Sequence, residues 1–285
     1  MAKNYTLGLY EKAMPSTFSF AEMLETTGNC GFDRLEISID ETDARLARLD
    51  WSDKQKQELY KLTQETGVPI KTMCLSGHRK YPLGSHDEKI RRRSLDIARK
   101  AIDFSVQVGV RVIQLAGYDV YYETHDSFTE GMFLENLVKI TEYAAQCGVA
   151  LGFETMEKPF MDTVAKAMKV VREVGNAWLG VYPDIGNLQN AAVLYGSDIK
   201  EDLMCGAGRI FAIHMKETKP GVYRDMRFGS GGHTPYEACL ECAAQQQVRM
   251  FTGEFWYLGE DDYLEEIKSS ARFLREKIER VYSAE

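Results

Sequence analysis

Short apolar runs alternate with longer amphipathic stretches along the whole of this 285-residue chain. Eight such runs end near residues 10, 39, 75, 116, 154, 182, 214 and 254. Regular alternation of strands and helices predicts a parallel sheet, and eight strand–helix units fill about 250 residues in a closed (β/α)8 barrel. The sequence therefore predicts a TIM barrel, as a single domain over residues 1–285. A doubly wound open sheet is the alternative, but it would use one crevice at its switch point.

Four consecutive predicted strands end on a side chain that can bind a metal ion. These are Glu154, Asp184, His214 and Glu254, which follow one another at spacings of 184 − 154 = 30, 214 − 184 = 30 and 254 − 214 = 40 residues. The C-terminal ends of barrel strands converge on one mouth, where active sites lie. Any one of these residues, taken alone, is more often a solvated or hydrogen-bonded residue. Together they predict a ligand set for one divalent cation.

Composition and charge exclude several classes of function. The formal net charge of −8 argues against nucleic-acid binding, which normally needs a basic patch. No apolar run approaches the length of about 18 residues that a membrane span needs. The first residues lack the charged-then-apolar pattern of a signal peptide, and the six scattered cysteines are typical of reduced thiols in a cytoplasmic protein. A homodimer is the default expectation for a soluble oligomer.

Several helix ends are predicted from capping residues. Ser52 and Gly67 are expected to cap the two ends of one helix. Ser85 is expected to cap the long helix over residues 87–108, and Asp162 the helix that runs to about residue 174. Thr234 followed by Pro235 predicts a further helix start. The long glycine-rich loop before it, residues 216–233, is predicted to be a binding loop.

Long segments of the chain carry a resemblance to a known family. They are residues 7–13, 39–43, 48–51, 74–85, 111–122, 182–187 and 216–221. On these segments the chain resembles the sugar-phosphate 3-epimerases of the xylose-isomerase-like TIM-barrel superfamily. Among them it is most similar to the L-ribulose-5-phosphate 3-epimerases of the bacterial L-ascorbate route. The resemblance implies an isomerase that interconverts L-ribulose 5-phosphate and L-xylulose 5-phosphate.

The resemblance also implies roles for the four strand-end residues. Relatives hold one divalent metal with Glu, Asp, His and Glu, which match Glu154, Asp184, His214 and Glu254. Glu154 and Glu254 are the implied acid/base pair, which would move the C3 proton through an enediolate intermediate. Three carboxylates and one imidazole favour Mn²⁺, with Mg²⁺, Co²⁺ and Zn²⁺ as alternatives.

Substrate binding is expected from polar and basic residues at the same strand ends. A phosphate group requires cations at the mouth, where arginine can bind it bidentately and lysine acts as a point charge. The phosphate candidates are His78, Arg79, Lys216 and Lys219, with Arg79 and Lys216 favoured and with Arg224 and Arg227 in the same loop. Glu36, Gln114 and Asn187 are the candidates for contacts with the sugar. Each also has an ordinary interpretation, as solvated surface or as a helix cap.

Three other functions are alternatives to 3-epimerisation. An aldose–ketose isomerase on the same barrel would move a proton between C1 and C2, and residue spacing does not separate it from an epimerase. A metal-dependent nuclease needs more histidine ligands and a basic groove, which five histidines and a net charge of −8 do not favour. A non-catalytic sugar-phosphate sensor would have no need for paired carboxylates across its ligand.

Overall fold

Eight parallel strands form one sheet in the computed structural model, which describes residues 4–282. Along the sheet the order is β6-β5-β4-β3-β2-β1-β8-β7, and each neighbouring pair is parallel. The strands are β1 Thr6–Tyr10, β2 Arg34–Ile39, β3 Ile70–Leu75, β4 Val112–Ala116, β5 Ala150–Glu154, β6 Leu179–Val181, β7 Ile213–Met215 and β8 Met250–Gly253.

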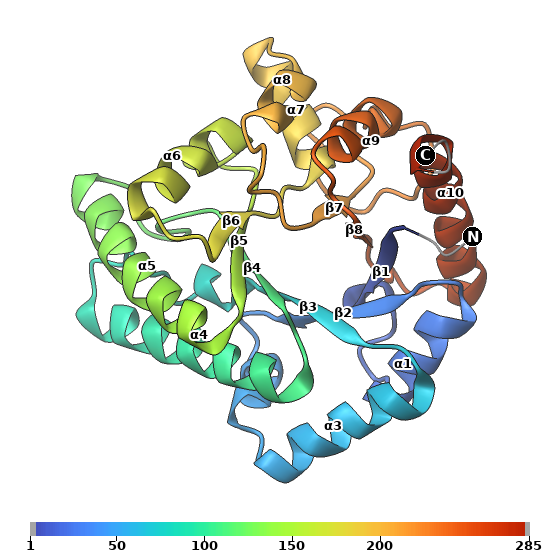
Figure 1. The fold of residues 1–285 in the computed structure, drawn as a ribbon, viewed down its shortest axis with the longest axis horizontal. Helices are drawn as coiled ribbons and strands as arrows, with labels where there is room; N and C mark the ends of the chain where they lie inside the picture. The colour runs from blue at the N-terminus through green and yellow to red at the C-terminus, as the bar shows by residue number, and fades with distance from the viewer. Residues whose placement is uncertain (1–3, 283–285) are drawn as a thin grey trace.

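The two outer strands of this order, β6 and β7, meet and close the ring. Two parallel bridges join them, Val181 with Ile210 and Asp184 with His214. The sheet is therefore a closed barrel, as Figure 1 shows from one end. The predicted TIM barrel is confirmed, and the open-sheet alternative is wrong because an open sheet leaves its outer strands unpaired. Of the predicted span 1–285, residues 1–3 and 283–285 lie outside the described residues.

Helices follow the strands and form an outer ring around the barrel (Figure 1). They are α1 Phe20–Asn29, α2 Asp43–Leu46, α3 Asp53–Thr66, α4 Glu88–Val108, α5 Ser127–Cys147, α6 Val164–Val174, α7 Ile185–Tyr195, α8 Ile199–Met204, α9 Tyr236–Gln245 and α10 Tyr263–Tyr282. Short 3₁₀ helices are η1 Glu11–Ala13, η2 Ala47–Asp50 and η3 Ser76–Arg79. The main core lies between sheet and helices; α4, for instance, buries Ile97, Ala101 and Phe104 at helical spacing. Within residues 4–282 no helix has both the length and the apolar character that a bilayer crossing requires.

The capping predictions were right for one helix and wrong for three. Ser52 caps α3 in a capping box with Gln55, and Gly67 ends that helix with φ = 70°. Asp87, and not Ser85, caps α4, because the Ser85 hydroxyl instead accepts from the Asp87 backbone N–H. Thr163, and not Asp162, caps α6, since Asp162 pairs with Lys166. The Thr234 hydroxyl donates to the Lys216 carbonyl, so α9 begins without a side-chain cap.

The interior of the barrel carries an unusual number of polar side chains. TIM-barrel interiors are ordinarily filled by Val, Ile and Leu. Here the fully buried inward-facing residues include Arg34, Glu36, Thr72, Gln114, Tyr182, His214 and Thr252. Tyr182 also packs against Val112 and Ala212 in an apolar cluster. The other members of this cluster, Ala150, Phe211 and Met250, lie with Val112 and Ala212 toward the N-terminal ends of the strands.

Arg34 fits inside the barrel only because residue 8 on the neighbouring strand is glycine. A Cβ on Gly8 would lie 2.6 Å from Arg34 Nη1 and 2.8 Å from its Cζ. The guanidinium is held where it is: Nη1 donates to Thr72 Oγ1 at 2.6 Å, and Nη2 donates to the Phe251 carbonyl at 2.8 Å. It therefore has no room to move away from a larger residue at position 8.

Replacing Gly8 with alanine is expected to destabilise the barrel by about 1–3 kcal/mol, the usual range for overpacking. Urea unfolding of Gly8→Ala against wild type measures this. Gly131→Ala is the matched control, because nothing lies within 4 Å of a Cβ at that exposed helical position. The control should be stabilised by up to about 1 kcal/mol, the helix-propensity difference. Equal stability of Gly8→Ala and wild type would contradict the account of Arg34.

Candidate metal centre and active site

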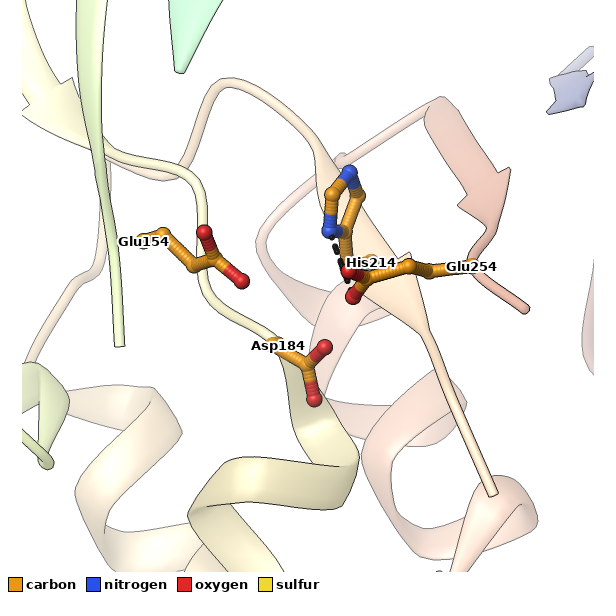
Figure 2. A group of neighbouring side chains, drawn as sticks. All are labelled: Glu154, Asp184, His214 and Glu254. Atoms are coloured by element: carbon orange, nitrogen blue, oxygen red, sulfur yellow. Dashed lines mark hydrogen bonds and ion pairs between the residues drawn. The ribbon is translucent and has the colours of Figure 1, made fainter. Parts of the chain in front are cut away.

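Four acidic and imidazole side chains meet at the C-terminal end of the barrel. Glu154 is the last residue of β5, Asp184 is the N-cap of α7 after β6, His214 lies within β7, and Glu254 directly follows β8. Each offers one ligand atom, and these atoms all lie within 4.8 Å of one another. In Figure 2 the four side chains converge from three sides of the mouth. The structure thus brings together the four residues that the strand-end pattern singled out.

The electrostatics of the group suit a divalent cation. Burial, together with the charge of Glu254, raises the pKa of the Glu154 carboxyl to about 8. Burial also raises the pKa of Asp184 to about 7, against the opposing effect of Lys216. For Glu254, burial opposes ionisation, but Lys216 and His214 hold the pKa of its carboxyl well below the ordinary value. Like charges brought together out of water favour a counter-ion between them.

The position of His214 between two carboxylates also suits a bound cation. Its Nε2 lies 2.5 Å from Glu36 Oε1 and its Nδ1 lies 3.1 Å from Glu254 Oε2, and the Gln114 amide nitrogen is also 3.1 Å from Nδ1. Burial lowers the pKa of this imidazole, but Glu36 and Glu254 together raise it well above its ordinary value, so an imidazolium can donate to both carboxylates. A metal ion bound at Nδ1 would take the place of the Nδ1 proton between the ring and the Glu254 carboxylate. The residues present therefore fit a metal bound by Glu154, Asp184, His214 and Glu254.

Lys216 supplies a buried positive charge beside the group. Its Nζ lies 2.8 Å from Asp184 Oδ2 and 3.4 Å from Glu254 Oε2. In contrast, within residues 4–282 the Glu154 carboxylate has no hydrogen bond or ion pair to another side chain. Glu154 is therefore the member of the group that is left free to contact a ligand.

A cavity of about 350 Å³ opens over the group. Both Glu154 and Glu254 line it, and its volume lies within the range of roughly 300–1,000 Å³ typical of small-molecule sites. The other lining residues come mostly from loops that follow the strands: Tyr10, Lys12, Asp40, Glu41, Thr42, Cys74, Ser76, Arg79, Tyr121, Met156, Glu157, Asn187, Lys216, Tyr223, Arg224 and Trp256. A ligand in this cavity would touch both carboxylates.

Some of the other predicted site residues line the cavity and some do not. Arg79, Asn187 and Lys216 line the cavity. Glu36 and Gln114 lie inside the barrel, fully buried against His214, and are not among the lining residues. Lys219 is exposed outside the cavity, where its backbone pairs with Val222.

His78 also lies outside the cavity lining. It is buried, with Nε2 3.2 Å from the Ser94 carbonyl oxygen, which only an Nε2–H can satisfy. Burial lowers the pKa of this histidine to about 4.

Two residues at the site were not predicted from the sequence, Lys12 and Tyr182. Lys12 lines the cavity next to Asp40, its ion-pair partner at 2.7 Å. Tyr182 donates its hydroxyl to Glu36 at 2.6 Å beneath the mouth. Tyr182 could have been predicted from strand periodicity. It stands two residues before Asp184, and in an extended chain these two side chains face the same side of the sheet.

Comparison with known proteins agrees with this architecture. The sequence profile of the xylose isomerase-like TIM barrel family matches residues 24–277. The chain belongs to this family. It is 44% identical to the L-ribulose-5-phosphate 3-epimerase UlaE of Salmonella typhimurium over 245 aligned residues. The alignment covers 86% of this chain and 84% of the relative.

Solved structures of the same fold are more distant in sequence. An L-ribulose 3-epimerase superposes with a TM-score of 0.81 at 15% identity, over 98% of this chain and 96% of the other. D-psicose 3-epimerase of Clostridium cellulolyticum superposes with a TM-score of 0.80 at 17% identity, over 96% and 99% of the two chains. At such identities the likeness establishes the fold that this family shares.

Mn²⁺ is expected to raise the unfolding temperature of chelator-treated protein, because it binds the folded carboxylate group and not the unfolded chain. Saturation to about 100 times the dissociation constant stabilises a protein by about 2.7 kcal/mol. Thermal unfolding across a Mn²⁺ titration measures the effect. Asp184→Asn should abolish it, although asparagine keeps the N-cap acceptor of α7. A wild-type transition that does not move with millimolar Mn²⁺ would contradict the metal centre.

His78 is expected to make the fold sensitive to acid. Its folded-state pKa of about 4 lies below the ordinary 6.5, so the unfolded chain binds more protons in that window. Stability should therefore fall as the pH drops from about 6.5 to 4, by up to about 3 kcal/mol for the full shift. Urea unfolding between these pH values should show a shallower decline for His78→Gln than for wild type. Parallel pH profiles would exclude this role.

Proposed function

We propose that this chain is a metal-dependent isomerase that interconverts L-ribulose 5-phosphate and L-xylulose 5-phosphate by epimerisation at C3. The observation that carries the proposal is the pair of carboxylates, Glu154 and Glu254, which line one cavity and belong to one ligand group. The relatives that are 44% identical are L-ribulose-5-phosphate 3-epimerases, which supports the same reaction here.

The reaction requires a base on each face of C3. One carboxylate removes the proton next to the C2 carbonyl, and the other returns a proton to the opposite face of the enediolate. Glu154 on β5 and Glu254 after β8 approach the cavity from opposite sides of the mouth (Figure 2). Lys216 lies beside Glu254, where its charge would favour the negative charge that develops on the substrate oxygens.

A divalent ion held by Glu154, Asp184, His214 and Glu254 would act as a Lewis acid toward the substrate oxygens. Mn²⁺ is the favoured ion because the set combines three carboxylates with one imidazole. Restoring turnover of chelator-treated enzyme with Mn²⁺, Mg²⁺, Co²⁺ or Zn²⁺ in turn identifies it.

Glu154→Gln and Glu254→Gln are each expected to lower turnover by at least about 10²–10⁴-fold, the usual contribution of a positioned acid/base group. The measurement is NMR of deuterium incorporation at C3 of L-xylulose 5-phosphate in deuterated water. Glu123→Gln is the matched control, because Glu123 follows β4 at the rim but lies outside the cavity lining. Near-wild-type exchange in either of the first two variants defeats the two-base mechanism. Exchange at C1 instead would identify an aldose–ketose isomerase.

The charge pairing in the cavity suggests which cations bind the phosphate. Lys12 is paired with Asp40, and Lys216 is paired with Asp184. Arg79 and Arg224 form no ion pair with a carboxylate of residues 4–282. Their guanidinium groups instead lie over aromatic rings, Arg79 4.7 Å from the centre of Tyr121 and Arg224 5.8 Å from the centre of Trp256. We assign phosphate recognition to these two arginines, with Lys216 closer to the reacting carbons.

Arg79→Ala is expected to lower kcat/KM for the phosphorylated ketose about 10- to 100-fold, the loss of a charged hydrogen bond. The same variant should turn over free L-ribulose as slowly as wild type does. Steady-state kinetics on both substrates measure the ratio. Lys219→Ala is the comparison, since Lys219 lies outside the cavity lining and should leave the ratio unchanged. Equal losses on both substrates in Arg79→Ala would remove Arg79 from the phosphate site.

We propose a cytoplasmic location, in which the six cysteines, all free in the structure, would stay reduced. Nothing in the charge or the cavity calls for a nucleic-acid partner. A homodimer remains the prediction for assembly, which sedimentation velocity measures directly.

A further inference from the structure

Glu36 makes a contact that the proposed reaction does not use. It lies on β2, is fully buried, and does not line the cavity, so a substrate there cannot reach it. Its Oε1 lies 2.5 Å from His214 Nε2, the ring nitrogen that faces away from the other three ligands. The remaining nitrogen, Nδ1, faces Glu254.

The second oxygen of Glu36 is held as firmly as the first. Tyr182 donates its hydroxyl to Oε2 at 2.6 Å, and the Thr252 hydroxyl lies 3.3 Å from the same oxygen. The network continues downward, because Arg34 Nη2 donates to Thr252 Oγ1 at 2.8 Å. The Glu36 side chain therefore has no freedom to turn toward the cavity.

A buried carboxylate and a buried guanidinium are costly compared with an apolar core of similar volume. Most TIM barrels fill this layer with branched aliphatic residues. In this chain Gly8 leaves the space that Arg34 occupies. Packing alone therefore does not account for Glu36 and Arg34 inside the barrel. The hydrogen bond between Glu36 and His214 does.

We propose that Glu36 is a positioning residue for the metal centre. By accepting the Nε2–H of His214, it fixes the ring orientation and the tautomer in which the Nδ1 lone pair points at the metal. Tyr182 positions Glu36 in turn. A carboxylate of this kind behind a ligating histidine typically changes metal affinity or activity by about 10–100-fold. The inference rests on the metal site of the proposed function and not on the identity of the substrate.

Two variants and a control test this by isothermal titration of Mn²⁺ into chelator-treated protein. Glu36→Gln keeps an acceptor but removes the charge, and Tyr182→Phe removes only the hydroxyl that holds Glu36. Tyr5→Phe is the matched control: Tyr5 is also buried, and its hydroxyl donates to Glu279 at 3.0 Å at the opposite end of the barrel.

We expect Mn²⁺ to bind about 10–100-fold more weakly to Glu36→Gln. Tyr182→Phe should show a smaller loss in the same direction, while Tyr5→Phe binds as wild type does. At saturating Mn²⁺ the KM for L-ribulose 5-phosphate should stay within about twofold of wild type in both test variants, because neither side chain lines the cavity. If Glu36→Gln does not fold, the comparison of Tyr182→Phe with Tyr5→Phe carries the test.

Unchanged Mn²⁺ affinity in Glu36→Gln and Tyr182→Phe would overturn the proposal. So would an equal loss in Tyr5→Phe, which would indicate a general effect on the barrel. A raised KM with unchanged Mn²⁺ affinity would make Glu36 a substrate contact instead. Because the affinity is measured without substrate, a wild-type protein that lacks 3-epimerase activity would refute the proposed function and leave this result intact.

Discussion

The barrel closes where the backbones of two metal-ligand candidates pair. Between β6 and β7 only two bridges complete the ring, and one of them pairs Asp184 with His214. The backbone N–H of His214 donates to the Pro183 carbonyl at 2.9 Å, so the pairing that closes the ring also places Asp184 and His214 side by side. A cation bound by both residues would tie the seam together from the side-chain end as well.

Most of the fold could be predicted because burial in a parallel barrel leaves a strong pattern in the sequence. Each strand is short and apolar, and each helix buries one face, so strands and helices alternate visibly. The helix starts at Ser85, Asp162 and Thr234 were wrong for a different reason. Each of these side chains binds a group other than the helix N-terminus that it was expected to cap. Capping preferences do not describe such competing partners.

The metal ligands could be predicted because strand ends of a barrel share one mouth, so position along the chain translates into position in space. Depth within the barrel could not be predicted in this way. Glu36 and Gln114 stand on strands like the ligands, but they lie one layer lower, beneath His214. The phosphate candidates depended on loop conformation and charge pairing. Lys219 and His78 lie outside the cavity lining, whereas Arg224 lies within it and has no carboxylate partner in the described part of the chain.

The apolar cluster at the N-terminal end determines how a ligand can reach the active site. Val112, Ala212 and their neighbours fill the barrel below the polar layer, so a ligand cannot pass through the barrel from end to end. Both epimers must therefore enter and leave through the C-terminal mouth of the barrel, past Arg79, Arg224 and the rings of Tyr121 and Trp256. Since an enzyme cannot change an equilibrium constant, the direction of net conversion depends only on how the ratio of the two sugar phosphates compares with that constant.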